Sequence, residues 1–197
     1  MDSSRGPGHM KFFYLFAFFL SFEAVHASVL KIDKDKCVVK FQAQGRPSAL
    51  VIEGDGGKCE GEVNLSAAQT VARVVKLDLR DFTTGMALRD RHMHEKYLET
   101  KKEQYQNTSI EFMDTKSMQE DLSKGSFKGA VPAKLVLHGV TKDVQVEFDL
   151  TKTENKITGH FKFQIKVSDF EIMIPSFMEI TMADVVDVSG KVEAIIN

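Results

Sequence analysis

Residues 161–167 read FKFQIKV, and apolar and polar side chains alternate one for one along this stretch. Successive side chains of an extended chain point to opposite faces, so one face of this segment is apolar and the other is polar. The apolar face carries Phe161, Phe163, Ile165 and Val167. This pattern predicts a strand with one face in the protein interior and the other in water.

The same alternation recurs along most of the chain, and turn-forming residues such as Gly54-Asp55-Gly56-Gly57 separate the runs. The further alternating stretches are 37–44, 58–65, 71–80, 133–139, 144–150 and 185–195. One apolar and one charged face in each run indicate an antiparallel sheet around a single interior. About eight strands are expected, and closure into a barrel would remove their exposed edges. A sandwich of two sheets is the alternative that alternation leaves open.

The shared phase of the runs predicts which side chains face inward. A barrel of this width either fills itself with side chains or holds one small apolar ligand, and the pattern favours neither. The predicted inward residues are Phe41, Leu77, Leu135, Leu137, Phe148, Phe161, Phe163 and Ile165.

Residues 86–100, which contain LRDRHMHEKYL at 88–98, break the alternation. Met86, Met93 and Tyr97 recur at helical spacing with Asp90 among them, which predicts a short helix that covers one end of the barrel. A carboxylate on the apolar side of a helix needs a partner, so Asp90 is expected to pair with His94 or with an arginine.

The sequence offers little support for metal binding or catalysis. Asp90 and His94 could supply two metal ligands from one helix face, but His92 points elsewhere, and no CxxC or HExxH motif is present. A Gly-x-Ser-x-Gly motif is absent, and both cysteines lie on apolar faces, where a thiol is inert. We therefore expect no metal, no cofactor and no catalytic residue. A net charge of −2 without a basic run argues against nucleic acid as a partner.

The N-terminal residues are typical of processing segments. Residues 1–9, MDSSRGPGH, read as a remnant of expression cloning. Residues 10–27 have a basic start, an uncharged apolar run and small residues before Ser28, which predicts a secretory signal peptide, with an uncleaved anchor as the alternative. The expected mature domain is 28–197, in the periplasm or outside the cell.

An oxidising compartment permits a disulfide between Cys37 and Cys59. If residues 37–44, 48–53 and 58–65 formed a three-stranded meander, the two Cα atoms would lie about 10 Å apart, beyond the roughly 7 Å that a disulfide spans. A bent or shortened middle strand would close this gap. A disulfide and two buried thiols both remain open.

Three short motifs are spaced along the chain. They are Arg89-Asp90-x-His92-Met93, the run LHGVTK from Leu137 to Lys142, and Gly61-x-Val63 on an earlier strand. They resemble the R-D-x-H-[LM] element, the L-H-G-V-T-[KR] element and the small residue-x-Val pattern of the YceI family, and the resemblance covers roughly residues 30–195. The chain departs from the family at Glu171, where a glycine is frequent after Asp169-Phe170.

The resemblance implies an all-β fold: an extended, eight-stranded, antiparallel, lipocalin-like barrel with a short helix near one end. It also implies a long apolar cavity for a polyisoprenoid or similar long-chain amphiphile, a possible homodimer and no enzymatic activity. Together with the inward pattern, it predicts these ligand-binding residues: Phe41, Leu77, Arg89, Asp90, His92, Met93, Tyr97, Leu135, Leu137, Phe148, Phe161, Phe163, Ile165 and Phe170. The alternatives are an enzyme that acts on a lipid or amide in the same cavity, and a structural envelope protein with a filled core.

Overall fold

The computed structural model describes residues 29–47, 50–65, 73–177 and 179–197. The expected cloning remnant (1–9) and signal peptide (10–27) lie outside the described residues. The strands are β1 Val29–Ile32, β2 Val38–Arg46, β3 Val51–Gly56, β4 Glu60–Asn64, β5 Arg73–Asp78, β6 Asn107–Phe112, β7 Ser126–Leu137, β8 Val140–Thr153, β9 Lys156–Lys166, β10 Ser176–Phe177 and β11 Ile180–Ile196. The helical segments are α1 Ala87–His92, a π-helical turn Met93–Tyr97, α2 Lys116–Leu122, and short 3-10 helices at Leu79–Asp81, Glu103–Tyr105 and Val167–Phe170.

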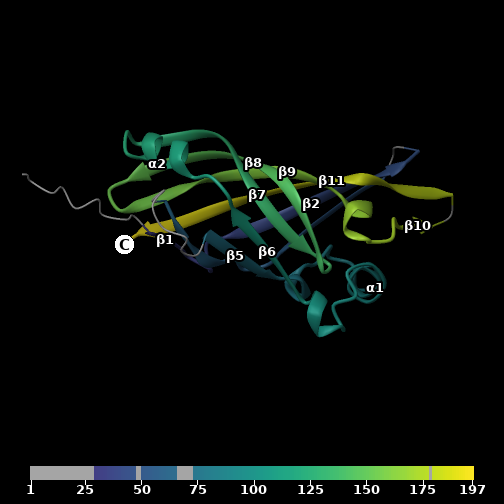
Figure 1. Cartoon of the computed structure of the whole chain (residues 1–197). Coiled ribbons are helices and arrows are strands. Elements are labelled where there is room, and N and C mark those ends of the chain that lie inside the picture. Colours follow the sequence, from purple (N-terminus) through teal and green to yellow (C-terminus); the bar gives the residue numbers. More distant parts are fainter. Residues whose placement is uncertain (1–28, 48–49, 66–72, 178) are drawn as a thin grey trace, which may run out of the picture.

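Eight antiparallel strands close into a barrel, as predicted. They pair in the order β1-β4-β5-β6-β7-β8-β9-β11, and β11 returns to β1 through the pair Leu30↔Ile196. The long strands β8, β9 and β11 run along the length of the molecule (Figure 1). α1 lies toward one end and α2 at the end that holds the C-terminus (Figure 1). A closed ring removes the exposed edges that an open sheet of this size would present.

The hairpin β2–β3 lies outside the closed ring. β2 pairs with β11 from Arg46↔Thr181 to Val38↔Lys191, and β1 takes over the same edge of β11 farther along. The hairpin therefore lengthens the barrel wall toward one end. Its outer strand β3 meets the segment before α1 through the bridge Asp55↔Thr83.

The membership of the barrel differs from the sequence expectation. Alternation predicts residues 37–44 as a barrel strand, but this stretch forms β2 outside the closed ring, and alternation does not predict β1 or β6. β1 is only four residues long, and β6 begins with the polar run Asn-Thr-Ser. Neither segment is long or apolar enough to show clear alternation.

A disulfide joins Cys37 to Cys59. The three-stranded meander that would have kept the cysteines apart does not form, because β4 pairs with β1 and β5 and not with β3. The cysteines lie directly before β2 and β4, and their Cα atoms are 5.4 Å apart. The bond therefore links the β2–β3 hairpin to β4 of the closed ring, although no backbone pairing joins β3 to β4.

α2 closes one end of the barrel. Met118 and Leu122, four residues apart, are both buried and so lie on one face of the helix. In the described part of the chain, no helix is long and apolar enough to cross a membrane.

Candidate ligand-binding site

A cavity of about 660 Å³ occupies the barrel and the space under the β2–β3 hairpin. Pockets that bind small molecules usually measure about 300–1,000 Å³. All eight predicted inward residues line this cavity. A core filled by its own side chains, which alternation left open, does not describe this interior.

Cross-strand glycines make room for two of the aromatic rings on the cavity wall. Phe41 on β2 lies opposite Gly54 on β3, and Phe161 on β9 lies opposite Gly190 on β11. A Cβ atom at either glycine would lie 2.4 Å from the ring of its phenylalanine. The rings therefore lie over the neighbouring strand instead of standing straight into the barrel.

The cavity opens beside α1. Of its lining residues, Leu50, Met86 and Leu88 are large apolar side chains that remain exposed, at 38%, 57% and 56%. Two of them belong to α1 and the residue before it, and the third precedes β3. At the opposite end Met118 of α2 lines the cavity and is buried, so that end is closed.

One face of α1 and the π-helical turn borders the cavity. The side chains on this face are Arg89, His92, Met93, Lys96 and Tyr97. Their spacing of three to four residues is that of one helix face. Lys96 was not among the predicted ligand-binding residues, although its position four residues after His92 and seven after Arg89 could have revealed it.

Asp90 does not line the cavity, and the ion pair expected for it is wrong. Its carboxylate accepts hydrogen bonds from the Thr83 hydroxyl (2.6 Å), the Thr84 backbone N–H (2.7 Å) and the Thr84 hydroxyl. The hydroxyls of Thr83 and Thr84 hold the pKa of Asp90 below its usual range. The segment before the helix folds back over its first turn, so the carboxylate is satisfied without a charged partner.

Arg89 is held by the same threonine. Its Nε donates to the Thr84 hydroxyl and one terminal nitrogen donates to the Thr84 carbonyl, both at 2.8 Å. The guanidinium is thus oriented at the cavity mouth while part of its N–H donors stays available.

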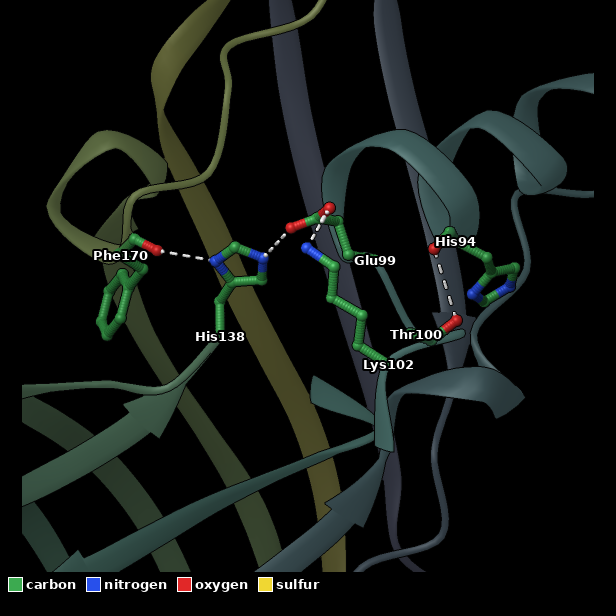
Figure 2. Close-up of polar contacts among 6 residues, drawn as sticks. All are labelled: His94, Glu99, Thr100, Lys102, His138 and Phe170. Carbon is green, nitrogen blue, oxygen red and sulfur yellow. Dashed lines mark hydrogen bonds and ion pairs between the residues drawn. The ribbon is translucent and has the colours of Figure 1, made fainter. Parts of the chain in front are cut away.

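Two histidines fasten the helix to the barrel. His94 Nε2 donates to the Phe82 carbonyl at 2.9 Å. His138, in the β7–β8 turn, contacts Glu99 through Nε2 at 3.1 Å and the Phe170 carbonyl through Nδ1 at 3.2 Å (Figure 2). The Lys102 ammonium, followed by His138, lowers the pKa of Glu99 through hydrogen bonds (Figure 2).

Phe170 is the second predicted ligand-binding residue that does not line the cavity. It is buried, and its carbonyl receives the His138 contact. It ends the 3-10 helix Val167–Phe170, after which Glu171 adopts a left-handed φ of 58°. This conformation favours glycine, so Glu171 adopts a backbone angle that is uncommon for a residue with a side chain. The twelve other predicted residues line the cavity, and their contact with a ligand stays a prediction.

The few ionisable groups on the described part of the cavity wall include bases but no carboxylates. Among the described residues that line the cavity there is no aspartate or glutamate, and the basic side chains are Arg89, His92 and Lys96. The described part of the chain also holds no group of three or more His, Cys, Asp or Glu side chains that could bind a metal. The site is therefore an apolar chamber with a basic mouth.

Comparisons with known proteins agree with this architecture. Residues 30–194 match the model of the YceI-like domain family. None of the curated protein sequences matches the chain. A polyisoprenoid-binding domain from Saccharophagus degradans, implicated in plant cell wall breakdown, is similar at 16% identity and a TM-score of 0.65, over 84% of this chain and 97% of that one. BcnA of Burkholderia cenocepacia is similar at 14% identity and a TM-score of 0.59, over 82% of this chain and 98% of that one.

Proposed function

Because the chain belongs to the family of YceI-like domains, we propose that it binds a polyisoprenoid or another long-chain amphiphilic lipid in its barrel and carries it without chemical change. The solved structure from Saccharophagus degradans, which has the same fold, is described as polyisoprenoid-binding.

The observation that carries the proposal is the length of apolar wall. Strands from all sides of the barrel contribute side chains to the cavity, from Leu30 on β1 to Ala194 on β11. Each methylene group moved from water into such surroundings contributes about 0.8 kcal/mol. A long chain can therefore bind tightly with few polar contacts.

The contacts of the histidines favour a carrier over an enzyme. Both ring nitrogens of His138 face acceptors outside the cavity, at Glu99 and at the Phe170 carbonyl. His92 lines the cavity, but no described carboxylate lies on the wall beside it to orient it as a general base.

The proposed location is the periplasm or the exterior of the cell, and the protein is proposed to act there as a monomer or a homodimer. The secretory pattern of residues 10–27 supports this location. The disulfide between Cys37 and Cys59 is compatible with it, because disulfides persist in oxidising compartments.

Mass spectrometry of an organic extract of the purified protein tests the proposal. We expect close to one long-chain lipid per protein, recovered intact after prolonged incubation. Leu135→Trp should reduce the lipid by filling the cavity, and Val136→Trp, on the exposed outer face of the same strand, should not. An extract without lipid, or with equal lipid from both folded variants, would overturn the proposal. Recovery of cleaved products would favour the enzyme.

A further inference from the structure

We propose that the head group of the lipid is anionic, with a carboxylate or phosphate that is bound by Arg89 and Lys96 at the cavity mouth. The inference rests on the proposed function and adds the chemical class of the ligand's polar end. Its basis is the distribution of charge on α1 and the π-helical turn that follows.

The carboxylates of this helical segment, and that of Glu99 just after it, each interact with neighbouring groups of the protein. Asp90 accepts hydrogen bonds from Thr83 and Thr84. Glu95 pairs with Lys101 at 2.9 Å, and Glu99 pairs with Lys102 at 2.7 Å. None of these carboxylates lines the cavity.

The bases show the opposite arrangement. Arg89 and Lys96 border the cavity, seven residues apart on the same face, with His92 between them. Within the described ranges, neither Arg89 nor Lys96 forms an ion pair with a carboxylate. Arg89 and Asp90 share the Thr84 hydroxyl but form no direct ion pair. Two positive charges therefore stand at the mouth of an apolar chamber without a carboxylate within ion-pair distance.

Such an arrangement discriminates between head groups. Cations that border a low-dielectric cavity attract an anion more strongly than the same cations would in water. An arginine whose position is already set by Thr84 also loses little freedom when it binds a carboxylate or phosphate. A neutral alcohol of the same chain length gains the apolar contacts only.

The test is competition against the neutral fluorescent probe N-phenyl-1-naphthylamine. Geranylgeranyl phosphate is compared with geranylgeraniol, and palmitate with hexadecanol, so that each pair differs in the head group alone. We expect each anion to displace the probe at a concentration about tenfold lower than its alcohol, the factor that one added charge-assisted hydrogen bond supplies. A preference within only one pair would assign the head group to that chemistry.

Variants assign the preference to the two side chains. Lys96→Gln and Arg89→Gln should each reduce the anion-to-alcohol ratio several-fold, because each removes a positive charge that faces the head group. Arg91→Gln is the matched control, because Arg91 is exposed on the same helix, does not line the cavity and loses the same charge. Lys96→Gln keeps the test valid if the loss of the Thr84 contacts unfolds the Arg89 variant.

The outcomes separate the two proposals. Equal displacement by anion and alcohol, or a ratio that both cavity variants leave unchanged, would overturn the anionic head group and leave lipid binding intact. If neither the probe nor any of the four lipids binds, the proposed function and the head-group assignment both fail.

Discussion

His138 Nε2 lies 3.1 Å from a carboxylate oxygen of Glu99, and this contact joins the β7–β8 turn to the segment that follows the cavity-bordering helix. The other ring nitrogen contacts the Phe170 carbonyl, and Tyr105 stacks on the ring with centroids 4.0 Å apart. One buried imidazole thus connects the turn, the helical segment and the 3-10 helix after β9. The motif L-H-G-V-T-K therefore has a structural role at this end of the barrel.

Replacement of that imidazole should destabilise the protein. His138→Ala removes a buried ring and leaves the Phe170 carbonyl without its partner, so we expect the free energy of unfolding in urea to fall by about 2 kcal/mol. His160→Ala, at an exposed position of β9, serves as the control and should change stability little. A loss for His138→Ala no larger than that of the control would contradict the anchoring role.

The Glu99 contacts predict a dependence of stability on pH. Hydrogen bonds from Lys102, then from His138, lower the folded-state pKa of Glu99 below its ordinary value of 4.5. A carboxyl group with a depressed pKa stabilises the fold above its unfolded pKa, and this contribution is lost as the pH falls through the folded value. Glu99→Gln should therefore reduce stability at neutral pH, and its difference from the wild type should shrink below pH 4.5. Urea unfolding of both proteins across this range measures the effect, and a constant difference would refute it.

The disulfide should contribute a large share of the stability. Cys37 and Cys59 are separated by 22 residues, and closing a loop of that length stabilises a fold by about 3 kcal/mol through the entropy of the unfolded chain. We expect a similar loss of unfolding free energy in the double variant Cys37→Ala/Cys59→Ala and in the wild type after reduction. If reduction left the urea midpoint unchanged, the bond would not constrain the unfolded chain.

Because Gly54 lies opposite Phe41, the loss of stability caused by a substitution at Gly54 should depend on the side chain at position 41. Gly54→Ala places a methyl group into the ring of Phe41 and close to the Thr83 carbonyl, and it should destabilise the protein by about 1–3 kcal/mol. The smaller side chain in Phe41→Leu should relieve part of this clash, so the double variant should lose less than the two single variants together. Additive losses would show that the ring and the glycine do not share this space.

Alternation predicted the cavity wall because it depends on a property of each strand alone. Phe161, Phe163 and Ile165 point inward whichever strands lie beside β9, since side chains alternate with a period of two. The order of the strands depends instead on contacts between residues that are distant in the sequence. Such contacts pair β4 with β1 instead of β3, and they bring Cys37 close to Cys59.

The errors at Asp90 and Lys96 have a similar origin. Helical spacing placed Asp90 among apolar residues, but the spacing does not reveal that Thr83 and Thr84 fold back to bind its carboxylate. Lys96 fits the cavity face by spacing, yet a lysine in a charged run is usually solvated. Only the position of the cavity mouth in the structure shows that Lys96 borders the cavity while other charged residues of the same run do not.

The contact between the helix and the cavity can be tested through Met93, which lies on the cavity face between Arg89 and Tyr97. Met93→Glu puts a carboxylate beside the apolar wall, where an unpaired charge is costly, so the affinity for N-phenyl-1-naphthylamine should fall at least about tenfold. Ala87→Glu adds the same charge on the same helix at an exposed position that does not line the cavity, and it should bind the probe like the wild type. Thermal melting checks that both variants remain folded. Unchanged affinity in a folded Met93→Glu protein would mean that the helix does not border the bound ligand.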